Sequence, residues 1–268
     1  MIIWHDGAWL DETESAIGIG DRGFTLGDGL FETMLWDGGR IHRFARHLAR
    51  LKASSAALGL PAPDAHEMEI AAHEIVTLND LEDARAAIRV VWSAGPGPRG
   101  LARPAQMQPT LFVTIAPSPK ATSPIMLATS QIRRSESAPS ARHKTLSYID
   151  NVMARAEAVR AGAGEALLLN SRGEVAGGAA SNLFLVIGGR LVTPPSEDGA
   201  LAGTMRAAVL EALPEIAVRS ISAAELARAE AIAISNALEG VRAASHCDGR
   251  ALAGDHPQIK ILQQASAA

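Results

Sequence analysis

The side chain best suited to covalent chemistry is that of Lys144, in the segment RHKTLSYIDNVMAR. The chain has 25 basic residues, but only four of them are lysines: Lys52, Lys120, Lys144 and Lys260. An arginine stays charged, whereas a lysine amine in a desolvated site can lose its proton and form a Schiff base with an aldehyde. Lys144 follows a polar loop and precedes a predicted helix, where an ordinary exposed lysine is also common. Taken alone, it is a candidate nucleophile beside that simpler alternative.

Three other positions have the chemistry to bind an anion. Arg50 lies in RFARHLARL on a predicted helix, where an arginine either binds an anion or is simply solvated. In ALAGTMRAAVLE, Gly203 and Thr204 begin a helix whose free N–H groups and positive dipole end favour a phosphate. The turn at Asn236 and Ala237 follows the apolar strand AIAIS. The last two patterns are also those of an ordinary capped helix start and a simple turn.

The composition favours a small molecule as the partner. The 268 residues are 47% hydrophobic, enough to bury a core in one large or two small domains, and this excludes a disordered chain. The net charge is −4 and no run of basic residues is present, so the sequence does not indicate binding to nucleic acid or to an anionic membrane. The single Cys247 and the lack of Cys/His ligand spacing predict no metal site and a reducing compartment. No segment reaches the ~20 apolar residues that span a bilayer, so we expect a cytoplasmic protein.

Turn signals predict a scaffold rich in antiparallel strands. Residue pairs that tolerate positive φ between short apolar runs predict five hairpins. They are Asp6-Gly7, Asp37-Gly38-Gly39, Arg172-Gly173, Gly188-Gly189 and Asp248-Gly249. Helical spacing of apolar residues predicts helices over 43–58, from Asp64 onward, over 148–160 and over 203–213. Strands are predicted over 88–93, 110–116, 166–169 and 183–186.

The stretch PSPKATSP interrupts this pattern, and similar elements follow it without a sequence repeat. It predicts a linker over 118–124 that joins an N-terminal α+β domain, 1–117, to a C-terminal α+β domain, 125–268. Lys144 and the helix at Gly203 belong to the second domain in this scheme, and Arg50 to the first. A cleft between two such domains is the natural place for a ligand.

The order of these segments is more specific than any one of them. The segments DRGFTLGDGLFETM, HLARL, HKTLSYIDNVMAR, GEVAGGAASNLFLV, AGTMRAAVLE and ISNALEGV resemble, in order, the motifs of the class IV aminotransferases. These are the fold type IV pyridoxal-phosphate enzymes, and the resemblance runs from about Asp21 to Val241. It implies pyridoxal 5′-phosphate (PLP) in a cleft between two α+β domains with antiparallel-rich sheets flanked by helices. It also implies a homodimer.

The resemblance implies roles for individual residues. Lys144 becomes the Schiff-base lysine and proton carrier. The phosphate ligands become Arg50, the helix start at Gly203, Thr204 and Met205, and the turn at Asn236 and Ala237. A dianionic phosphate does favour an arginine fork together with a helix N-terminus. Tyr148 either reaches the phenolic oxygen of the cofactor or packs the start of its helix.

The sequence departs from the family pattern at three positions. Gly177 stands where most members carry the glutamate that keeps the pyridine nitrogen protonated and the ring electron-poor. Glu174, Glu32 or a water are candidates to replace it, and impaired catalysis is the alternative. Met205 and Ala237 stand where many relatives have threonines that contact the phosphate, which leaves backbone amides for that task.

Within the family, three local features resemble the aminodeoxychorismate lyases. The segment VVWSAGPGPRGLARP is similar to their substrate loop, although Ala94 replaces its first arginine. SNALEG and AGTMR are the other two. The resemblance implies cleavage of 4-amino-4-deoxychorismate to 4-aminobenzoate and pyruvate, a step toward folate. Arg99 then binds a substrate carboxylate, or is a solvated loop residue. Because aromatisation drives this elimination, a lyase tolerates Gly177 better than a transaminase does.

Two alternatives stay open. An aminotransferase acting on branched-chain or D-amino acids would use Lys144 to move a proton from Cα to the cofactor. A degenerate member would bind PLP without turnover, because Gly177 replaces the usual glutamate. Both enzymatic hypotheses take a small-molecule amine as substrate.

Overall fold

The structure is a computed structural model that describes residues 1–267, and it divides into two compact units. Unit 1 holds residues 1–120 together with 143–147, and unit 2 holds residues 121–142 and those from 148 onward. The change of unit after residue 120 falls within the expected linker. The segment 143–147, which we call the Lys144 segment, was expected in the second domain but packs with unit 1.

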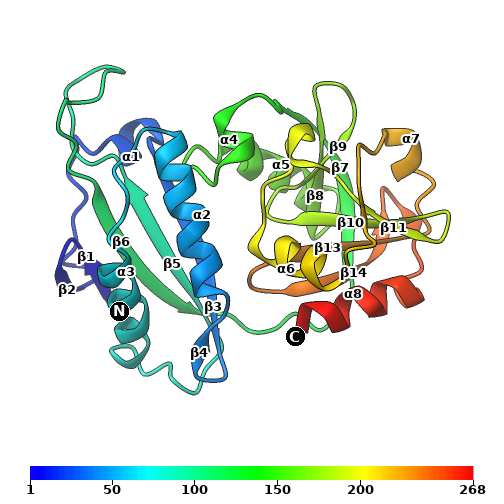
Figure 1. The fold of residues 1–268 in the computed structure, drawn as a ribbon, viewed down its shortest axis with the longest axis horizontal. Helices are drawn as coiled ribbons and strands as arrows, with labels where there is room; N and C mark the ends of the chain where they lie inside the picture. Colours follow the sequence, from blue (N-terminus) through cyan, green and yellow to red (C-terminus); the bar gives the residue numbers. More distant parts are fainter. Residues whose placement is uncertain (268) are drawn as a thin grey trace. The chain divides into compact units, whose positions relative to one another are not determined.

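Unit 1 is a six-stranded antiparallel sheet with the helices α2 and α3 packed on it (Figure 1). Its elements are β1 (Ile2–His5), β2 (Ala8–Asp11), α1 (Arg22–Leu26), β3 (Gly29–Asp37), β4 (Arg40–Ile41), α2 (Phe44–Ala57), α3 (Ala65–Thr77), β5 (Ala86–Ser93) and β6 (Thr110–Pro117). The strand order is β2-β1-β6-β5-β3-β4. The central strand β5 therefore pairs with β3 and β6. Helix α2 packs against β3.

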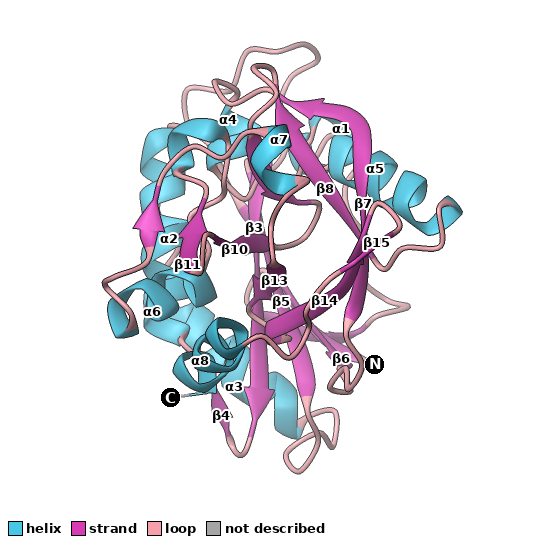
Figure 2. Ribbon diagram, turned by 90° about the vertical axis from the view of Figure 1, so that its right-hand side faces the viewer, coloured by secondary structure: helices cyan, strands magenta, loops and turns pink. Residues whose placement is uncertain are grey.

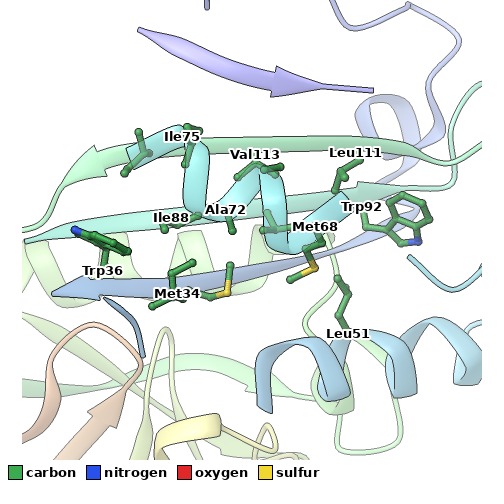
Figure 3. Packing of buried hydrophobic residues seen from close by; sticks show 14 of the residues in the cluster. Met34, Trp36, Leu51, Met68, Ala72, Ile75, Ile88, Trp92, Leu111 and Val113 are labelled. Atoms are coloured by element: carbon green, nitrogen blue, oxygen red, sulfur yellow. The ribbon is translucent and has the colours of Figure 1, made fainter. Parts of the chain in front are cut away.

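The apolar face of α3 closes the core of unit 1. Asp64 caps this helix, because its carboxylate accepts hydrogen bonds from two N–H groups of the first turn. Met68, Ala72 and Ile75 follow at helical spacing and are fully buried. Figure 3 shows them packed over the sheet, close to Ile88. This burial fixes α3 on the sheet and leaves α2 beside β3.

Unit 2 is a nine-stranded mixed sheet with helices packed against it (Figure 2). Its first elements are β7 (Ile125–Arg134), α4 (Pro139–Arg142), α5 (Ile149–Arg160), β8 (Glu165–Asn170), β9 (Val175–Gly178), β10 (Asn182–Ile187), β11 (Arg190–Thr193) and the 3₁₀ turn η1 (Ser196–Asp198). They are followed by α6 (Thr204–Ala212), β12 (Ala217–Val218), α7 (Ala223–Leu226), β13 (Ala231–Asn236), β14 (Gly240–Cys247), β15 (Arg250–Ala251) and α8 (Pro257–Ala267). The strand order is β12-β11-β10-β13-β14-β7-β8-β9, and β15 pairs with β14.

Helices α6 and α8 cover the middle of this sheet. Met205 and Val209 of α6 and Leu262 of α8 are buried together with Phe184 of β10. Helix α5 packs on β7 and β8 through small residues such as Ala154, which let the helix approach the sheet closely. The packing of α6 matters for function, because its first turn is one of the predicted phosphate sites.

The sequence predicts this α+β class correctly. All five hairpins are present, at β1–β2, β3–β4, β8–β9, β10–β11 and β14–β15. The predicted helices are α2, α3, α5 and α6. Helix α3 begins within a residue of its expected start, and the other three lie within a residue of both expected ends. The sheet of unit 2 also contains three parallel pairs, β11–β12, β14–β7 and β7–β8, so it is antiparallel-rich but mixed. None of the helices within residues 1–267 is long and apolar enough to cross a membrane.

Candidate active site

The Lys144 segment lies along the start of β3. The carbonyl of Lys144 accepts a hydrogen bond from Phe31 N at 2.9 Å, and Leu146 N donates to the carbonyl of Gly29 at 2.9 Å. Gly29 is required here, because a Cβ at this position would lie 2.7 Å from both Leu146 Cδ1 and the carbonyl oxygen of Trp92. The backbone of Lys144 is therefore held like that of an additional strand residue.

The side chain of Lys144 differs from those of the other three lysines. It is half-buried, whereas Lys52, Lys120 and Lys260 are exposed. Its Nζ lies 4.0 Å from the centre of the Phe31 ring, which covers one side of the amine. The protein thus fixes this one lysine from its backbone to its nitrogen, as a nucleophile requires.

Arg50 faces a buried carboxylate that the sequence considered for a different role. Glu32 lies on β3 and is only 1% exposed. Arg50 donates to it from Nε at 2.8 Å and from Nη2 at 2.6 Å, and His47 Nδ1 donates at 2.7 Å. Burial raises the pKa of Glu32, but the hydrogen bonds from Arg50 and His47 outweigh it and hold the pKa below its usual value. Glu32 is therefore an anion that orients Arg50.

His47 links this cluster to Lys144. Burial lowers the pKa of His47, while its hydrogen bond to Glu32 acts in the opposite direction. The positive charges of Arg50 and Lys144 lower the pKa further, so the Lys144 amine lies close enough to act on this imidazole. Unit 1 thus brings together Lys144 and Arg50 through β3 and the first turns of α2.

The loop that carries Arg99 is held at its base by a buried arginine. Arg22 donates to the carbonyls of residues 100–102 at 2.9–3.2 Å and to Asp28 at 2.8 Å. Arg103 pairs with the same Asp28 at 2.6 Å. The loop backbone is therefore fixed directly after Arg99, whereas the side chain of Arg99 is exposed. No contact joins Arg99 to Lys144 or Arg50, and its role as a substrate ligand stays a prediction.

In unit 2, the first turn of α6 lies beside a tightly packed glycine. Gly203 is the N-cap and has no side chain to cap the helix, while Thr204 and Met205 are buried. A Cβ on Gly203 would lie 1.9 Å from Oδ1 of Asn182, whose amide donates to the carbonyl of Leu201 at 2.8 Å. The helix start therefore has backbone amides and no room for a side chain, which suits a phosphate.

The turn after β13 lies next to this helix start. A Cβ on Gly240 would lie 3.9 Å from Cε of Met205. Asn236 orders the turn, because its Oδ1 accepts hydrogen bonds from Leu238 N at 3.0 Å and Glu239 N at 2.8 Å. The Oγ of Ser235 is buried without a hydrogen-bond partner among the described residues. A ligand oxygen would satisfy such a group, so these residues fit a phosphate-bearing cofactor.

Gly177 lies beside an arginine. A Cβ at this position would lie 3.7 Å from Nη1 of Arg134. The carboxylates considered as replacements are bound elsewhere: Glu174 pairs with Arg172 at 2.7 Å and accepts from Asn170, and Glu32 holds Arg50. Tyr148 is the N-cap residue of α5 and is half-buried.

A comparison with known sequences decides the family. The sequence model of the family described as amino-transferase class IV matches residues 29–247. The chain belongs to the class IV aminotransferases. It is accordingly a PLP-dependent enzyme.

Relatives of this class IV aminotransferase carry out different reactions. It is 32% identical over 219 residues to a candidate branched-chain-amino-acid aminotransferase of Methanocaldococcus jannaschii, which covers 80% of this chain and 75% of that protein. It is 27% identical over 218 residues to the aminodeoxychorismate lyase of Bacillus subtilis, with 80% and 74% covered. The solved branched-chain aminotransferase of Thermoproteus uzoniensis is 28% identical, with a TM-score of 0.88 and 99% and 93% covered.

Two residues near the predicted site residues of this class IV aminotransferase were not placed there from the sequence: Glu32 was considered only as a replacement for the missing glutamate, and Arg134 was not singled out. A carboxylate inside the apolar strand LFETMLW is a usable signal, because a buried glutamate needs cationic partners such as those of HLAR. Arg134 gives no such signal, since it follows another arginine on β7. Only the fold places it beside Gly177.

Proposed function

We propose that this enzyme is a PLP-dependent lyase that converts 4-amino-4-deoxychorismate into 4-aminobenzoate and pyruvate. The observation that carries the proposal is position 177, which has no carboxylate and lies beside the cation Arg134. A transaminase depends on a protonated, electron-poor cofactor ring, whereas the formation of an aromatic ring drives this elimination. The similarity to the lyase of Bacillus subtilis and the lyase-like loop around Arg99 also support it.

The proposal assigns the cofactor contacts as follows. In unit 1, Arg50 binds the phosphate, and Glu32 holds the guanidinium in position. In unit 2, the phosphate ligands are the first-turn amides at Gly203, Thr204 and Met205 and the turn at Asn236 and Ala237. Tyr148 donates to the phenolic oxygen. When bound, PLP supplies a carbonyl carbon that reacts with amines and a conjugated ring that accepts electron density.

Lys144 moves the protons of the reaction. Its Nζ takes the proton from the substrate ring carbon that bears the amine. The bond between the adjacent ring carbon and the enolpyruvyl oxygen then breaks as the ring becomes aromatic. A returned proton converts enolpyruvate into pyruvate. Arg99 binds a carboxylate of the substrate at the tip of the loop that Arg22 fixes. The Phe31 ring excludes water from one side of the Lys144 amine.

The test compares two reactions on one preparation. Purified protein with PLP is given 4-amino-4-deoxychorismate, and 4-aminobenzoate and pyruvate are measured. The same protein is given branched-chain or D-amino acids with 2-oxoglutarate, and glutamate is measured. We expect equal amounts of 4-aminobenzoate and pyruvate from the wild type and none from Lys144→Ala. Robust transamination with no 4-aminobenzoate would overturn the lyase assignment.

An aminotransferase is the second candidate, because the relative in Methanocaldococcus jannaschii is named for that activity. A third outcome is a protein that binds PLP and turns over nothing, as Gly177 permits. In this case the bound cofactor would give an absorption band that is lost in Lys144→Ala. No added amine would change that band in the wild type.

The proposal includes a cytoplasmic homodimer. Helix α5 presents large apolar side chains to solvent along one face, at spacings of one and two turns: Ile149, Val152, Met153 and Val159 are 45–66% exposed. Exposed apolar side chains in such a row are typical of a surface that a partner covers. Light scattering at micromolar concentration should give twice the mass of 28.0 kDa, and a monomer would exclude the dimer.

A further inference from the structure

The side chain of Arg134 lies against glycine residues. Arg134 is the last residue of β7, and its side chain passes Gly199, where a Cβ would lie 3.3 Å from Cδ of Arg134. Its Nη1 donates to the carbonyl of Gly199 at 3.4 Å, and its Nη2 donates to the carbonyl of Gly178 at 3.3 Å. Gly177 lies next to the same guanidinium. The end of this side chain is thus placed by backbone contacts alone.

The guanidinium of Arg134 has no carboxylate partner among residues 1–267. The carboxylates of Glu165 and Asp150 act on its charge from a distance, and the buried Glu165 pairs with Arg155 at 3.2 Å and accepts from Ser181 at 3.1 Å. An arginine has five N–H donors, and the two long hydrogen bonds to carbonyls use only two of them. Burial lowers the pKa of Arg134, although a guanidinium remains charged. Arg134 is therefore a half-buried cation with donors to spare.

The surroundings connect Arg134 to the cofactor elements of unit 2. Gly199 belongs to the segment that leads to Gly203 and the first turn of α6. A Cβ on Gly177 would lie 3.3 Å from the carbonyl oxygen of Ser181, and the next residue, Asn182, contacts Gly203. Arg134, Gly177 and the helix start thus belong to one continuous set of contacts.

We infer that Arg134 donates a hydrogen bond to the ring nitrogen of bound PLP, in the place that a carboxylate holds in most relatives. A guanidinium can donate only to an unprotonated nitrogen, so the ring stays neutral and is a weak electron acceptor. This inference concerns the cofactor and does not depend on which reaction the enzyme catalyses. A weak electron acceptor would slow transamination. It would affect the elimination less, because the formation of an aromatic ring drives that reaction.

The backbone conformation at Gly177 disfavours any residue with a side chain. Its φ is 153°, a conformation that residues with side chains rarely adopt. A glutamate at this position would need the strand to change its conformation, and its Cβ would press on the carbonyl of Ser181 at 3.3 Å. Restoring the carboxylate is therefore a poor test, and Arg134 is the residue to change.

The experiment measures the protonation state of the ring nitrogen directly. The protein is loaded with PLP labelled with ¹⁵N in the ring, and the ¹⁵N chemical shift is followed as a function of pH. We expect an unprotonated nitrogen in the wild type at neutral pH. In Arg134→Met, we expect the apparent pKa of the nitrogen to rise by at least about one unit, a tenfold change in proton affinity.

Arg133→Met is the matched control. Arg133 precedes Arg134 on β7 but is exposed, and within the described residues it donates only to the carbonyl of Ser130 at 3.2 Å. This variant should titrate like the wild type. Arg134→Gln keeps a neutral donor and should give an intermediate shift, which covers the case in which Arg134→Met does not fold.

Two results would overturn the inference: a protonated ring nitrogen in the wild type, or the same titration in the wild type and the Arg134 variants. The wild-type measurement needs neither a variant nor a substrate. A neutral nitrogen combined with robust transamination would contradict the lyase proposal and leave the role of Arg134 intact. A protonated nitrogen combined with 4-aminobenzoate formation would contradict the role of Arg134 and leave the lyase proposal intact.

Discussion

Replacement of Glu32 by glutamine removes the anion that holds Arg50 and His47. The Glu32 carboxylate is 1% exposed and the Arg50 side chain 13%, so solvent does little to screen the pair. Breaking a buried ion pair by removing one partner costs roughly 3–5 kcal/mol, because the other charge is left uncompensated. The glutamine oxygen still accepts one hydrogen bond, so we expect the free energy of unfolding to fall by about 3 kcal/mol.

The pH dependence of this loss identifies its cause. The pKa of Glu32 is lower in the folded protein than in the unfolded chain, where it is about 4.5. Its contribution to stability is therefore fully present above that pH and is lost as the pH falls through the folded value. The wild type and Glu32→Gln should differ by the full amount at neutral pH and converge in acid.

Urea denaturation followed by circular dichroism at a series of pH values measures both effects. Glu69→Gln is the matched control, because Glu69 lies exposed on α3 and should change the unfolding free energy by less than about 0.5 kcal/mol. A Glu32→Gln variant as stable as the control, or a loss that stays constant with pH, would refute the electrostatic reasoning.

Two further predictions concern the core and the substrate loop. Ile75→Ala should lower the free energy of unfolding by roughly 2–5 kcal/mol, since Ile75 is fully buried between α3 and the sheet. A much smaller loss in urea denaturation would be evidence against this packing. Arg99→Gln should raise KM for the lyase substrate about tenfold through loss of a charged hydrogen bond, with the melting temperature unchanged because the side chain is exposed. An unchanged KM in steady-state assays would remove Arg99 from the site.

The predictable part of the fold depends on local signals. Hairpins follow from pairs such as Asp6-Gly7, because positive φ is a property of the residues themselves. Helix α3 follows from Asp64 and the apolar spacing after it. The prediction that Lys144 differs from the other lysines follows from its residue type and its motif, and the structure shows it as half-buried.

The remaining features depend on long-range contacts. Lys144 was placed in the second domain, but hydrogen bonds to Gly29 and Phe31 join its segment to unit 1, and no local pattern encodes such a pairing. The Glu32–Arg50 pair could have been expected, since a carboxylate in an apolar strand requires a cation. The position of Arg134 beside Gly177 could not, because two adjacent arginines look alike until the strand fixes which one faces inward.

The measurement that tests the central assignment most directly is borohydride reduction of the PLP-loaded protein, followed by peptide mapping with mass spectrometry. Reduction makes the bond between the cofactor and its lysine permanent. We expect a single modified peptide that contains Lys144, the one half-buried lysine among the four. A modification at Lys52, Lys120 or Lys260, or at no lysine at all, would contradict it.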